Sequence, residues 1–252
     1  MSTELQRHCE EIQRCNQRGG RMLSIVDLLE AGTLSRDLAA YALATISAGA
    51  SFMVGALPGG AGKTTVMGAL LNLVPRNVTL VTAENEAVIE QGMHERSSRR
   101  CYICHEIGNG FYHAYLWGQA LRRYFMLPST GHMMATNLHA DTIEQARAQV
   151  CGENAVPAPD FRRMNLLFFL SVERSGGRIR RRIVSAWESD GEHDHQAVFG
   201  PEARPSFTSK LVSAADIESA NDMIDAIVHS GARSIEQVRS VFVNSRHHSS
   251  SS

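Results

Sequence analysis

The sequence predicts an α/β protein with a mostly parallel sheet, an antiparallel hairpin at its edge, and small helical appendages at its two ends. Short apolar runs alternate with helical patterns along residues 50–150, which is typical of parallel strands joined by crossover helices. Two longer strand-like runs then flank a glycine turn, and this arrangement indicates a hairpin. The chain of 252 residues is 43% apolar, enough for a sizeable buried core.

The first 49 residues are expected to form an N-terminal helical segment. Their opening stretch is polar and helix-forming, and it lacks the apolar run of a signal peptide. Ser24 and Asp27 form a capping-box pattern at the start of a short helix. Ser35 then opens a helix rich in Ala and Leu that ends at Gly49.

Residues 50–198 carry the alternating pattern and are expected to form the core domain. The predicted strands are ASFMV, VTLVTAEN, YICHE and GHMMATNLH, and the predicted helices are VMGALLNLV, residues 86–99, LWGQALRRYFML and TIEQARAQV. The predicted hairpin consists of LLFFLSVE and RIRRRIVSAW. After a linker with two prolines, residues 205–246 predict two small helices, and residues 247–252 predict a disordered tail.

Composition excludes several classes of protein. The 25 Lys and Arg residues balance 26 Asp and Glu, so no global charge points to nucleic acid or an anionic membrane. The five cysteines are an odd number and, without an export signal, are expected to be reduced thiols of a cytoplasmic protein. The uncharged stretch from Leu38 to Gly62 is broken by glycines and a proline, so it predicts a helix and a strand, with no integral membrane segment.

The stretch PGGAGKTT has the composition of a phosphate-binding loop between a strand and a helix. Three glycines, at 59, 60 and 62, are expected to let backbone N–H groups turn toward a polyphosphate at the helix N-terminus. Lys63 would bridge phosphates, and the Thr64 hydroxyl would hold Mg²⁺. Leu57 stands where such loops usually begin with glycine. The predicted nucleotide-binding residues are Pro58, Gly59, Gly60, Ala61, Gly62, Lys63, Thr64 and Thr65.

Around this loop the chain resembles the secretion ATPase superfamily, the motors of type II and type IV secretion and of type IV pili. The similarity covers residues 22–187: the loop is followed by TAEN, which resembles that family's Asp box, and by TGHMMATNLHAD, which resembles its His box. The resemblance implies a RecA-like P-loop NTPase core that uses Mg²⁺ and hydrolyses ATP to power transport or assembly of a partner. It also implies a homo-oligomer, usually a hexamer in that family, an unidentified protein or DNA translocation partner, and a cytoplasmic location, peripheral to a membrane through that partner.

The same resemblance assigns roles to three side chains. Glu106, at the end of YICHE, corresponds to the Walker B carboxylate that polarises the attacking water, although the Arg-Asp that usually follows is missing. Glu84 would help to organise the metal, and His139 would sense the γ-phosphate. Alternatives remain open: Glu106 as a structural acid, and His139 as a strand-end histidine bonded to backbone. His132 is expected to anchor the turn before its strand.

The CYICH stretch also matches the CxxCH spacing of haem attachment and could begin a zinc site. On a strand, however, residues three apart point to opposite faces, so Cys101 and Cys104 would diverge. The arginines at 178, 180, 181 and 182 crowd one strand of the predicted hairpin and suit either a solvated face or a subunit boundary. The sequence thus leaves three alternatives to an ATPase. They are a nucleotide-dependent regulatory or binding module with weak or no hydrolysis, a small-molecule P-loop kinase, and a metal-binding module built on CxxCH.

Overall fold

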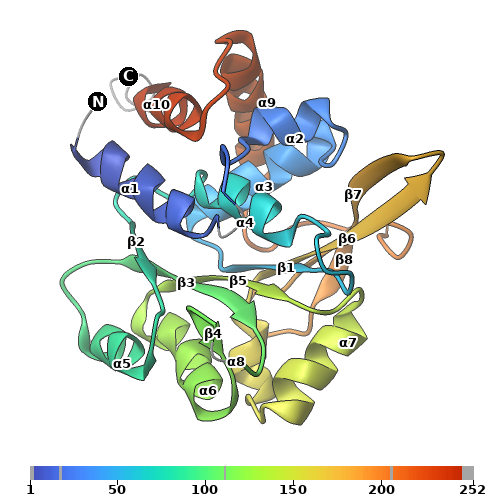
Figure 1. Cartoon of the computed structure of the whole chain (residues 1–252). Helices are drawn as coiled ribbons and strands as arrows, with labels where there is room; N and C mark the ends of the chain where they lie inside the picture. Colours follow the sequence, from blue (N-terminus) through green and yellow to red (C-terminus); the bar gives the residue numbers. More distant parts are fainter. Residues whose placement is uncertain (1–2, 17–18, 111, 205–206, 246–252) are drawn as a thin grey trace.

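In the computed structural model, which describes residues 3–16, 19–110, 112–204 and 207–245, an eight-stranded sheet lies between two layers of helices (Figure 1). Its order is β2-β3-β5-β1-β6-β7-β8, with β4 beside β3. The strands are β1 (Phe52–Gly55), β2 (Thr79–Thr82), β3 (Arg100–Ile107), β4 (Tyr115–Leu116), β5 (Met133–Leu138), β6 (Leu166–Ser175), β7 (Arg178–Glu188) and β8 (Gln196–Phe199).

Strand directions confirm the predicted mixed sheet. All pairings among β2, β3, β5, β1 and β6 are parallel, and so is that of β4 with β3, whereas β6–β7 and β7–β8 are antiparallel. Strand β6 therefore belongs both to the parallel sheet and to the predicted hairpin, which turns at Gly176 and Gly177. Because the parallel strands are covered on both sides, they read as nearly continuous apolar runs.

The helices form one layer on each face of the sheet (Figure 1). One layer contains α1 (Thr3–Arg14), α2 (Ile25–Glu30), α3 (Arg36–Ala48), α4 (Lys63–Leu71), α9 (Ala214–His229) and α10 (Ile235–Ser245). The other contains α5 (Glu86–His94), α6 (Gly118–Met126), α7 (Ile143–Arg147) and α8 (Ala158–Arg162), with a 3₁₀ turn at Leu127–Thr130 and a π-helical turn at Ala148–Glu153.

The N- and C-terminal helices are part of the main core. Ile12 of α1, Ile224 of α9 and Phe242 of α10 are buried in the same apolar cluster as Phe52 of β1. The predicted helical appendages therefore exist as helices, and they cover one face of the sheet. The predicted division of the chain into 1–49, 50–198 and 205–246 stays a prediction.

Capping explains why several helices begin and end where the sequence predicts. Ser24 and Asp27 form the reciprocal bonds of a capping box, and Ser35 accepts from the N–H of Leu38. Gly49 ends α3 with a φ of 105°, a conformation that favours glycine. The short elements β4, α8 and β8 were not expected, since runs of two to five residues carry little periodicity. The predicted tail, residues 247–252, lies outside the described residues.

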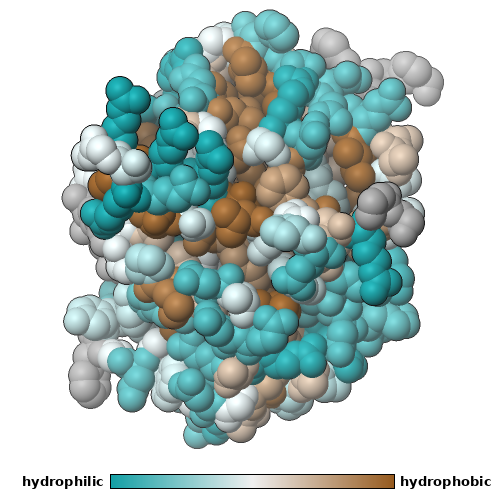
Figure 2. Space-filling model, turned by 90° about the vertical axis from the view of Figure 1, so that its right-hand side faces the viewer, coloured by the Kyte–Doolittle hydropathy of each residue, from teal (hydrophilic) through white to brown (hydrophobic). Residues whose placement is uncertain are grey.

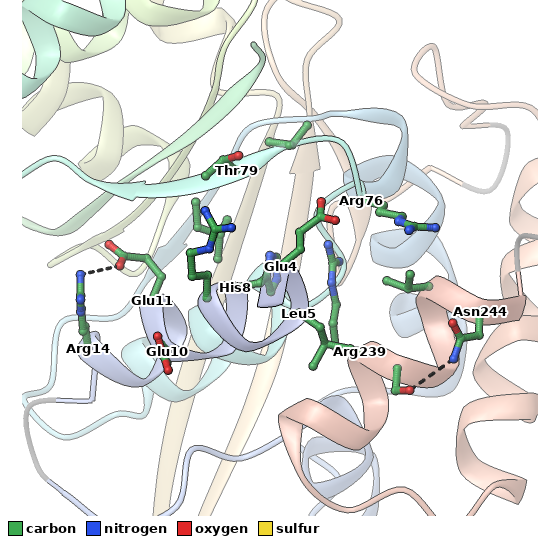
Figure 3. Close-up of a pocket in the computed structure, with 15 residues that line it drawn as sticks. Glu4, Leu5, His8, Glu10, Glu11, Arg14, Arg76, Thr79, Arg239 and Asn244 are labelled. Carbon is green, nitrogen blue, oxygen red and sulfur yellow. Dashed lines mark hydrogen bonds and ion pairs between the residues drawn. The ribbon is translucent and has the colours of Figure 1, made fainter. Parts of the chain in front are cut away.

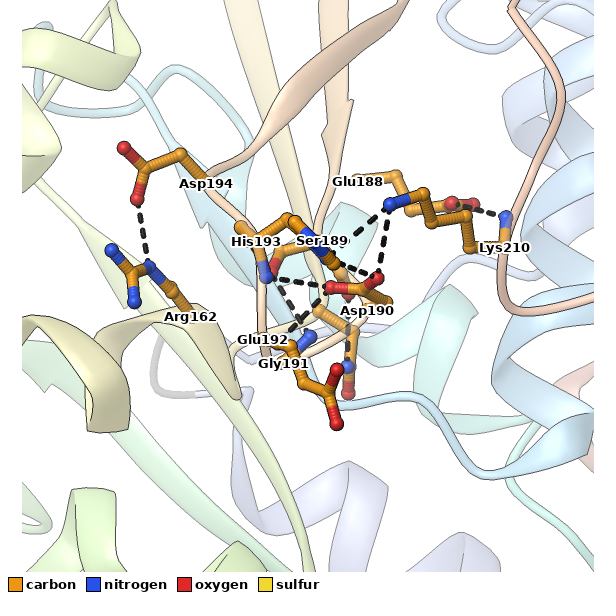
Figure 4. Close-up of polar contacts among 10 residues, drawn as sticks. Arg162, Glu188, Ser189, Asp190, Gly191, Glu192, His193, Asp194 and Lys210 are labelled. Atoms are coloured by element: carbon orange, nitrogen blue, oxygen red, sulfur yellow. Dashed lines mark hydrogen bonds and ion pairs between the residues drawn. The ribbon is translucent and has the colours of Figure 1, made fainter.

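A buried carboxylate joins the sheet to the C-terminal segment (Figure 4). Glu188, at the end of β7, is only 4% exposed. It accepts hydrogen bonds from the Tyr41 hydroxyl at 2.5 Å, the Ser209 hydroxyl at 2.5 Å and the Lys210 N–H at 2.8 Å. Proximity of Glu188 and burial raise the pKa of Tyr41, so the phenol remains a donor. The network holds the start of the C-terminal helices against α3 and β7.

Candidate nucleotide-binding site

The loop between β1 and α4 has the backbone geometry of an anion-binding turn. Gly60 and Gly62 have φ values of 77° and 98°, which a side chain would strain. The N–H of Ala61 donates to the Pro58 carbonyl and closes the turn. No side chain caps α4 at Gly62, so the helix directs its first N–H groups and its positive dipole end into the site. Gly59 was expected to share this role but has an ordinary φ.

Leu57 is accommodated at the position where glycine is usual. Its side chain is 48% exposed and its φ is not positive, in agreement with the restriction that Pro58 imposes. The Leu57 N–H donates to Asp141 Oδ1 at 2.7 Å. Its carbonyl lies 3.1 Å from His139 Nδ1. The start of the loop is therefore fixed by residues that follow β5.

Lys63 lies where the ends of three strands meet. Its side chain is buried, and Nζ donates to the Ala56 carbonyl at 3.1 Å. The same Nζ lies 3.2 Å from His139 Nδ1 and 3.5 Å from Glu106 Oε1. Three residues that the sequence places in a nucleotide site, at positions 63, 106 and 139, are thus in mutual contact.

A β-bulge aims Glu106 at this lysine. Between Cys104 and Ile107 the pairing of β3 with β5 shifts register, so β3 holds one extra residue there. The buried Asn137 donates from Nδ2 to the His105 carbonyl at 2.8 Å, which satisfies a backbone group in the bulge. The position of the Glu106 carboxylate therefore depends on Asn137, a residue that the motifs did not single out.

Burial dominates the electrostatics of Glu106. The side chain is almost enclosed, and this desolvation raises its pKa above the ordinary value; nearby Lys63 and His139 oppose the rise without cancelling it. Oε1 has no hydrogen-bond partner, although it lies 3.5 Å from Lys63 Nζ and 3.9 Å from His139 Nε2. A buried carboxylate with an unsatisfied oxygen indicates a functional group, because desolvation makes such a carboxylate costly for stability.

His139 can bond in only one of two ways at a time. Nδ1 is near both the Leu57 carbonyl, which requires a proton on Nδ1, and Lys63 Nζ, which requires its absence. The side chain is 46% exposed, so it reaches from the protein into the open side of the site. His132, by contrast, bonds the Gly92 carbonyl and the Arg100 N–H, as an anchor of the preceding turn.

A cavity of about 530 Å³ lies over the loop. Its walls come from the N-terminal segment, the loop and start of α4, the ends of β3 and β5, and the β6–β7 hairpin. They include Asn16, Arg21, Leu28, Thr33, Gly59, Gly60, Gly62, Lys63, Thr64, Thr65, Glu106, Tyr115, His139, Leu170, Ile179, Arg180 and Arg181. Beside the polar loop, its lining includes the apolar residues Leu28, Leu170 and Ile179.

Figure 2 shows the face toward which the β6–β7 hairpin projects in Figure 1. A band of hydrophobic side chains crosses its upper half, and hydrophilic residues surround the band. Two apolar residues of this hairpin, Ile179 and Val184, are exposed. The cavity thus borders on apolar surface as well as on the charged loop.

Glu84 does not join this group. It follows β2, two strands beyond β5 in the sheet order, and its side chain is about half exposed. Its nearest charged partner among the described residues is His113, at 3.9 Å. Its predicted role near the metal stays a prediction.

Oxygen ligands suited to Mg²⁺ are present beside the loop. The half-buried Thr64 and the buried Glu106 both line the cavity, and Glu106 Oε1 has no hydrogen-bond partner among the described residues. Hydroxyl and carboxylate oxygens are the donors that this cation prefers. Thr64 and Glu106 therefore fit an ion that also takes phosphate oxygens.

The two cysteines of CxxCH diverge as expected on a strand. Cys101 is buried in the core on one face of the sheet and Cys104 in the core on the other. Burial raises the pKa of both thiols, that of Cys104 to about 12. In the described part of the chain, no cluster of three or more His, Cys, Asp or Glu side chains could hold a metal ion. Two thiols on opposite faces cannot share one ion or one haem.

A larger cavity, about 730 Å³, lies beside α1 and away from the loop (Figure 3). Two of its lining residues support the other end of α4: His8 Nε2 bonds the Leu71 carbonyl, and Arg239 donates to the carbonyls of Asn72 and Val74. Burial lowers the pKa of His8 to about 3 and that of Arg239 to about 10, so at neutral pH only Arg239 is charged. A cation is favourable at a helix C-terminus. His8 and Arg239 therefore hold the C-terminal end of α4, opposite the end that carries the loop.

Helix length and the contacts of the arginines bear on the expected absence of a membrane segment and on the expected subunit boundary. Among the described residues, no helix combines the length and apolarity needed to cross a membrane. Two arginines at the start of β3 bond within this chain: Arg99 donates to the carbonyls of Gly49 and Gly131, and Arg100 pairs with Glu95. Of the arginines considered at a subunit boundary, Arg180 and Arg181 of β7 line the cavity over the loop.

Comparison with solved structures gives three similar chains. The ATPase DotB of Yersinia pseudotuberculosis is 11% identical over 86% of this chain and 62% of its own, with a TM-score of 0.46. The VirB11 ATPase of the Brucella suis type IV secretion system is 17% identical over 64% of this chain and 54% of its own, with a TM-score of 0.43. The ATPase DotB of Legionella pneumophila is 11% identical over 86% of this chain and 57% of its own, with a TM-score of 0.42.

No family model matches the sequence, and no curated protein does. This chain spans less than two thirds of the length of each of the three solved chains. All three are ATPases by name, and VirB11 is named as part of a type IV secretion system, the group whose motifs the sequence resembles. Each TM-score is below 0.5, so the geometry of the site carries the functional conclusion.

Proposed function

We propose that this chain is a RecA-like P-loop ATPase of the secretion and pilus type, which binds Mg·ATP and hydrolyses it. The observation that carries the proposal is the meeting of Lys63, Glu106 and His139 within 4 Å of one another at the N-terminus of α4. These residues come from the start of α4, from β3 and from the residue after β5, and all three line one cavity. Phosphoryl transfer needs this kind of positioned charge and little covalent chemistry.

Each group has a role that its surroundings support. Lys63 and the N–H groups at the start of α4 bind the polyphosphate, and the apolar residues of the cavity take the adenosine. Mg²⁺, held by Thr64 and phosphate oxygens, would neutralise part of the phosphate charge. Glu106 orients the attacking water and accepts its proton, and His139 donates a hydrogen bond to the terminal phosphate.

Phosphate release by purified protein tests this assignment. Glu106→Gln should keep ATP binding but lower turnover by roughly 100-fold or more, as expected when a general base is lost. Exposed Glu202, far along the chain from the motifs, supplies the matched carboxylate-to-amide control, Glu202→Gln. Equal turnover in wild type and Glu106→Gln would remove Glu106 from the mechanism.

A second function is favoured by one feature of the same residue. Burial raises the pKa of Glu106, so at a given pH a larger share of this side chain is protonated than in an exposed carboxyl group, and the protonated form cannot accept a proton from water. The chain would then act as a nucleotide-dependent regulatory or binding module with weak hydrolysis. Tight ATP binding with no phosphate release above that of Glu106→Gln would select this alternative.

We also propose that the protein assembles into a ring in the cytoplasm. A ring-forming homo-oligomer, a hexamer in the family that the motifs resemble, would act in the cytoplasm on an unidentified protein or DNA partner. Size-exclusion chromatography with a non-hydrolysable ATP analogue tests the ring. A monomer under saturating analogue would contradict it.

A further inference from the structure

The β6–β7 hairpin brings one arginine onto the phosphate loop of its own chain. Arg181 is opposite Val172 in the hairpin register, and the neighbouring Ile183 N–H donates to the Thr33 carbonyl at 2.9 Å, which fixes this part of β7. Arg181 Nε and Nη2 donate to the Gly60 carbonyl at 3.4 and 3.3 Å. A Cβ added to Gly62 would be 3.2 Å from Arg181 Cδ. The side chain therefore lies across the turn that precedes α4.

Arg181 has no carboxylate to neutralise it within the described residues, since none of the ion pairs there includes it. Its two bonds to Gly60 are long and go to a neutral carbonyl, so they use only part of the guanidinium's donor capacity. Both of these bonds use Nε and Nη2, and Arg181 also lines the cavity. A planar fork of this kind suits phosphate oxygens, which accept shorter and stronger charge-assisted bonds.

The charge of the cavity wall points the same way. Arg21, Lys63, Arg180 and Arg181 line it, and Glu106 is the acid in that wall. Arg21 is paired with Asp27. Glu106 already lies beside Lys63. The charges of Arg180 and Arg181 are therefore not neutralised by an acid in the cavity wall. A polyphosphate bound on the loop would be the nearest anion.

We infer that Arg181 binds the polyphosphate in cis, so that each subunit supplies its own phosphate-contacting arginine from the β6–β7 hairpin. This inference rests on the proposed ATP site. It assigns the hairpin a part in nucleotide binding, where the sequence pattern left a solvated face or a subunit boundary. Arg182, the next residue, is exposed and makes no contact with the loop among those described.

Titration calorimetry with ATP and ADP on four proteins tests the inference. Arg181→Gln retains an N–H donor for the Gly60 carbonyl but removes the charge, and Arg181→Lys retains the charge but removes the fork. Arg182→Gln is the control for loss of charge on the same strand. We expect Arg181→Gln to bind ATP roughly 10- to 100-fold more weakly than wild type, Arg181→Lys to fall between them, and Arg182→Gln to match wild type.

A role limited to holding Gly60 gives a different pattern, because the amide of Arg181→Gln would restore that bond. Wild-type affinity in Arg181→Gln would thus overturn the inference, and so would an equal loss in Arg182→Gln. Lys63→Ala separates this outcome from failure of the proposed function. If wild type binds ATP and Lys63→Ala does not, only the assignment of Arg181 fails; if wild type takes up no ATP, both fail.

Discussion

Glu106→Gln should stabilise the protein at neutral pH while it impairs turnover. The carboxylate is 6% exposed, and burial raises its pKa despite a nearby ammonium. At 3.5 Å, the attraction between Glu106 and Lys63 is about 5 kcal/mol for an effective dielectric of about 20. A raised pKa means that the cost of desolvating the carboxylate exceeds this attraction. The neutral amide avoids that cost and keeps nearly the same shape.

The sign of the pH dependence follows from proton binding. Because the folded state holds the Glu106 proton more tightly than the unfolded state, the free energy of unfolding of the wild type falls as pH rises between the ordinary carboxyl pKa, 4.5, and the raised one. The variant lacks this loss. Its advantage should be absent below the ordinary pKa, should grow by about 1.4 kcal/mol for each unit by which the pKa is raised, and should be constant above.

Urea unfolding of wild type, Glu106→Gln and Glu202→Gln at a series of pH values measures this advantage. Glu202 is exposed, so its amide variant should follow the wild type at every pH. The reasoning is refuted if Glu106→Gln is less stable than wild type at pH 8, or if the difference between the two does not change with pH.

Two further substitutions test how the structure positions and supports the site. Asn137→Ala removes the hydrogen bond to the His105 carbonyl in the bulge and should cost about 1–3 kcal/mol of stability, which urea unfolding measures. It should also lower turnover, measured by phosphate release, more than it lowers ATP affinity. Asn137→Asp retains the size but loses the donor, so it should not restore activity. Glu188→Ala removes the acceptor of three donors, of which the Tyr41 hydroxyl is buried, and should cost about 3 kcal/mol. The exposed pair of Asp194 with Arg162 offers the control, since Asp194→Ala should cost less than about 1 kcal/mol; equal losses in thermal unfolding would contradict the burial argument.

Local sequence signals predicted the parts of the site that local chemistry determines. The glycines at 60 and 62 predict their own positive φ values, and the buried strand before them predicts that the loop stands at a sheet edge. Glu106 was predicted because an acid ended an apolar run, and strand alternation placed Cys101 and Cys104 on opposite faces. Each inference needed only a few consecutive residues.

Contacts between distant segments could not be read in this way. The bulge at Glu106 depends on the pairing of β3 with β5, and nothing in YICHE signals the extra residue. Arg181 reaches Gly60 across 121 positions of sequence, so the run of arginines alone could not show which one faces the loop. For Glu84 the motif resembles a family site while the side chain is about half exposed beside His113, so its role near the metal stays a prediction.

Calorimetric titration of ATP into wild type and Lys63→Ala, with Mg²⁺ present, examines the phosphate site itself. The account predicts saturable binding to wild type and a loss of at least about 10-fold in Lys63→Ala, because the buried Nζ stands where the helix N-terminus and three strand ends converge. Binding of equal strength by both proteins, or no heat from either, would contradict it.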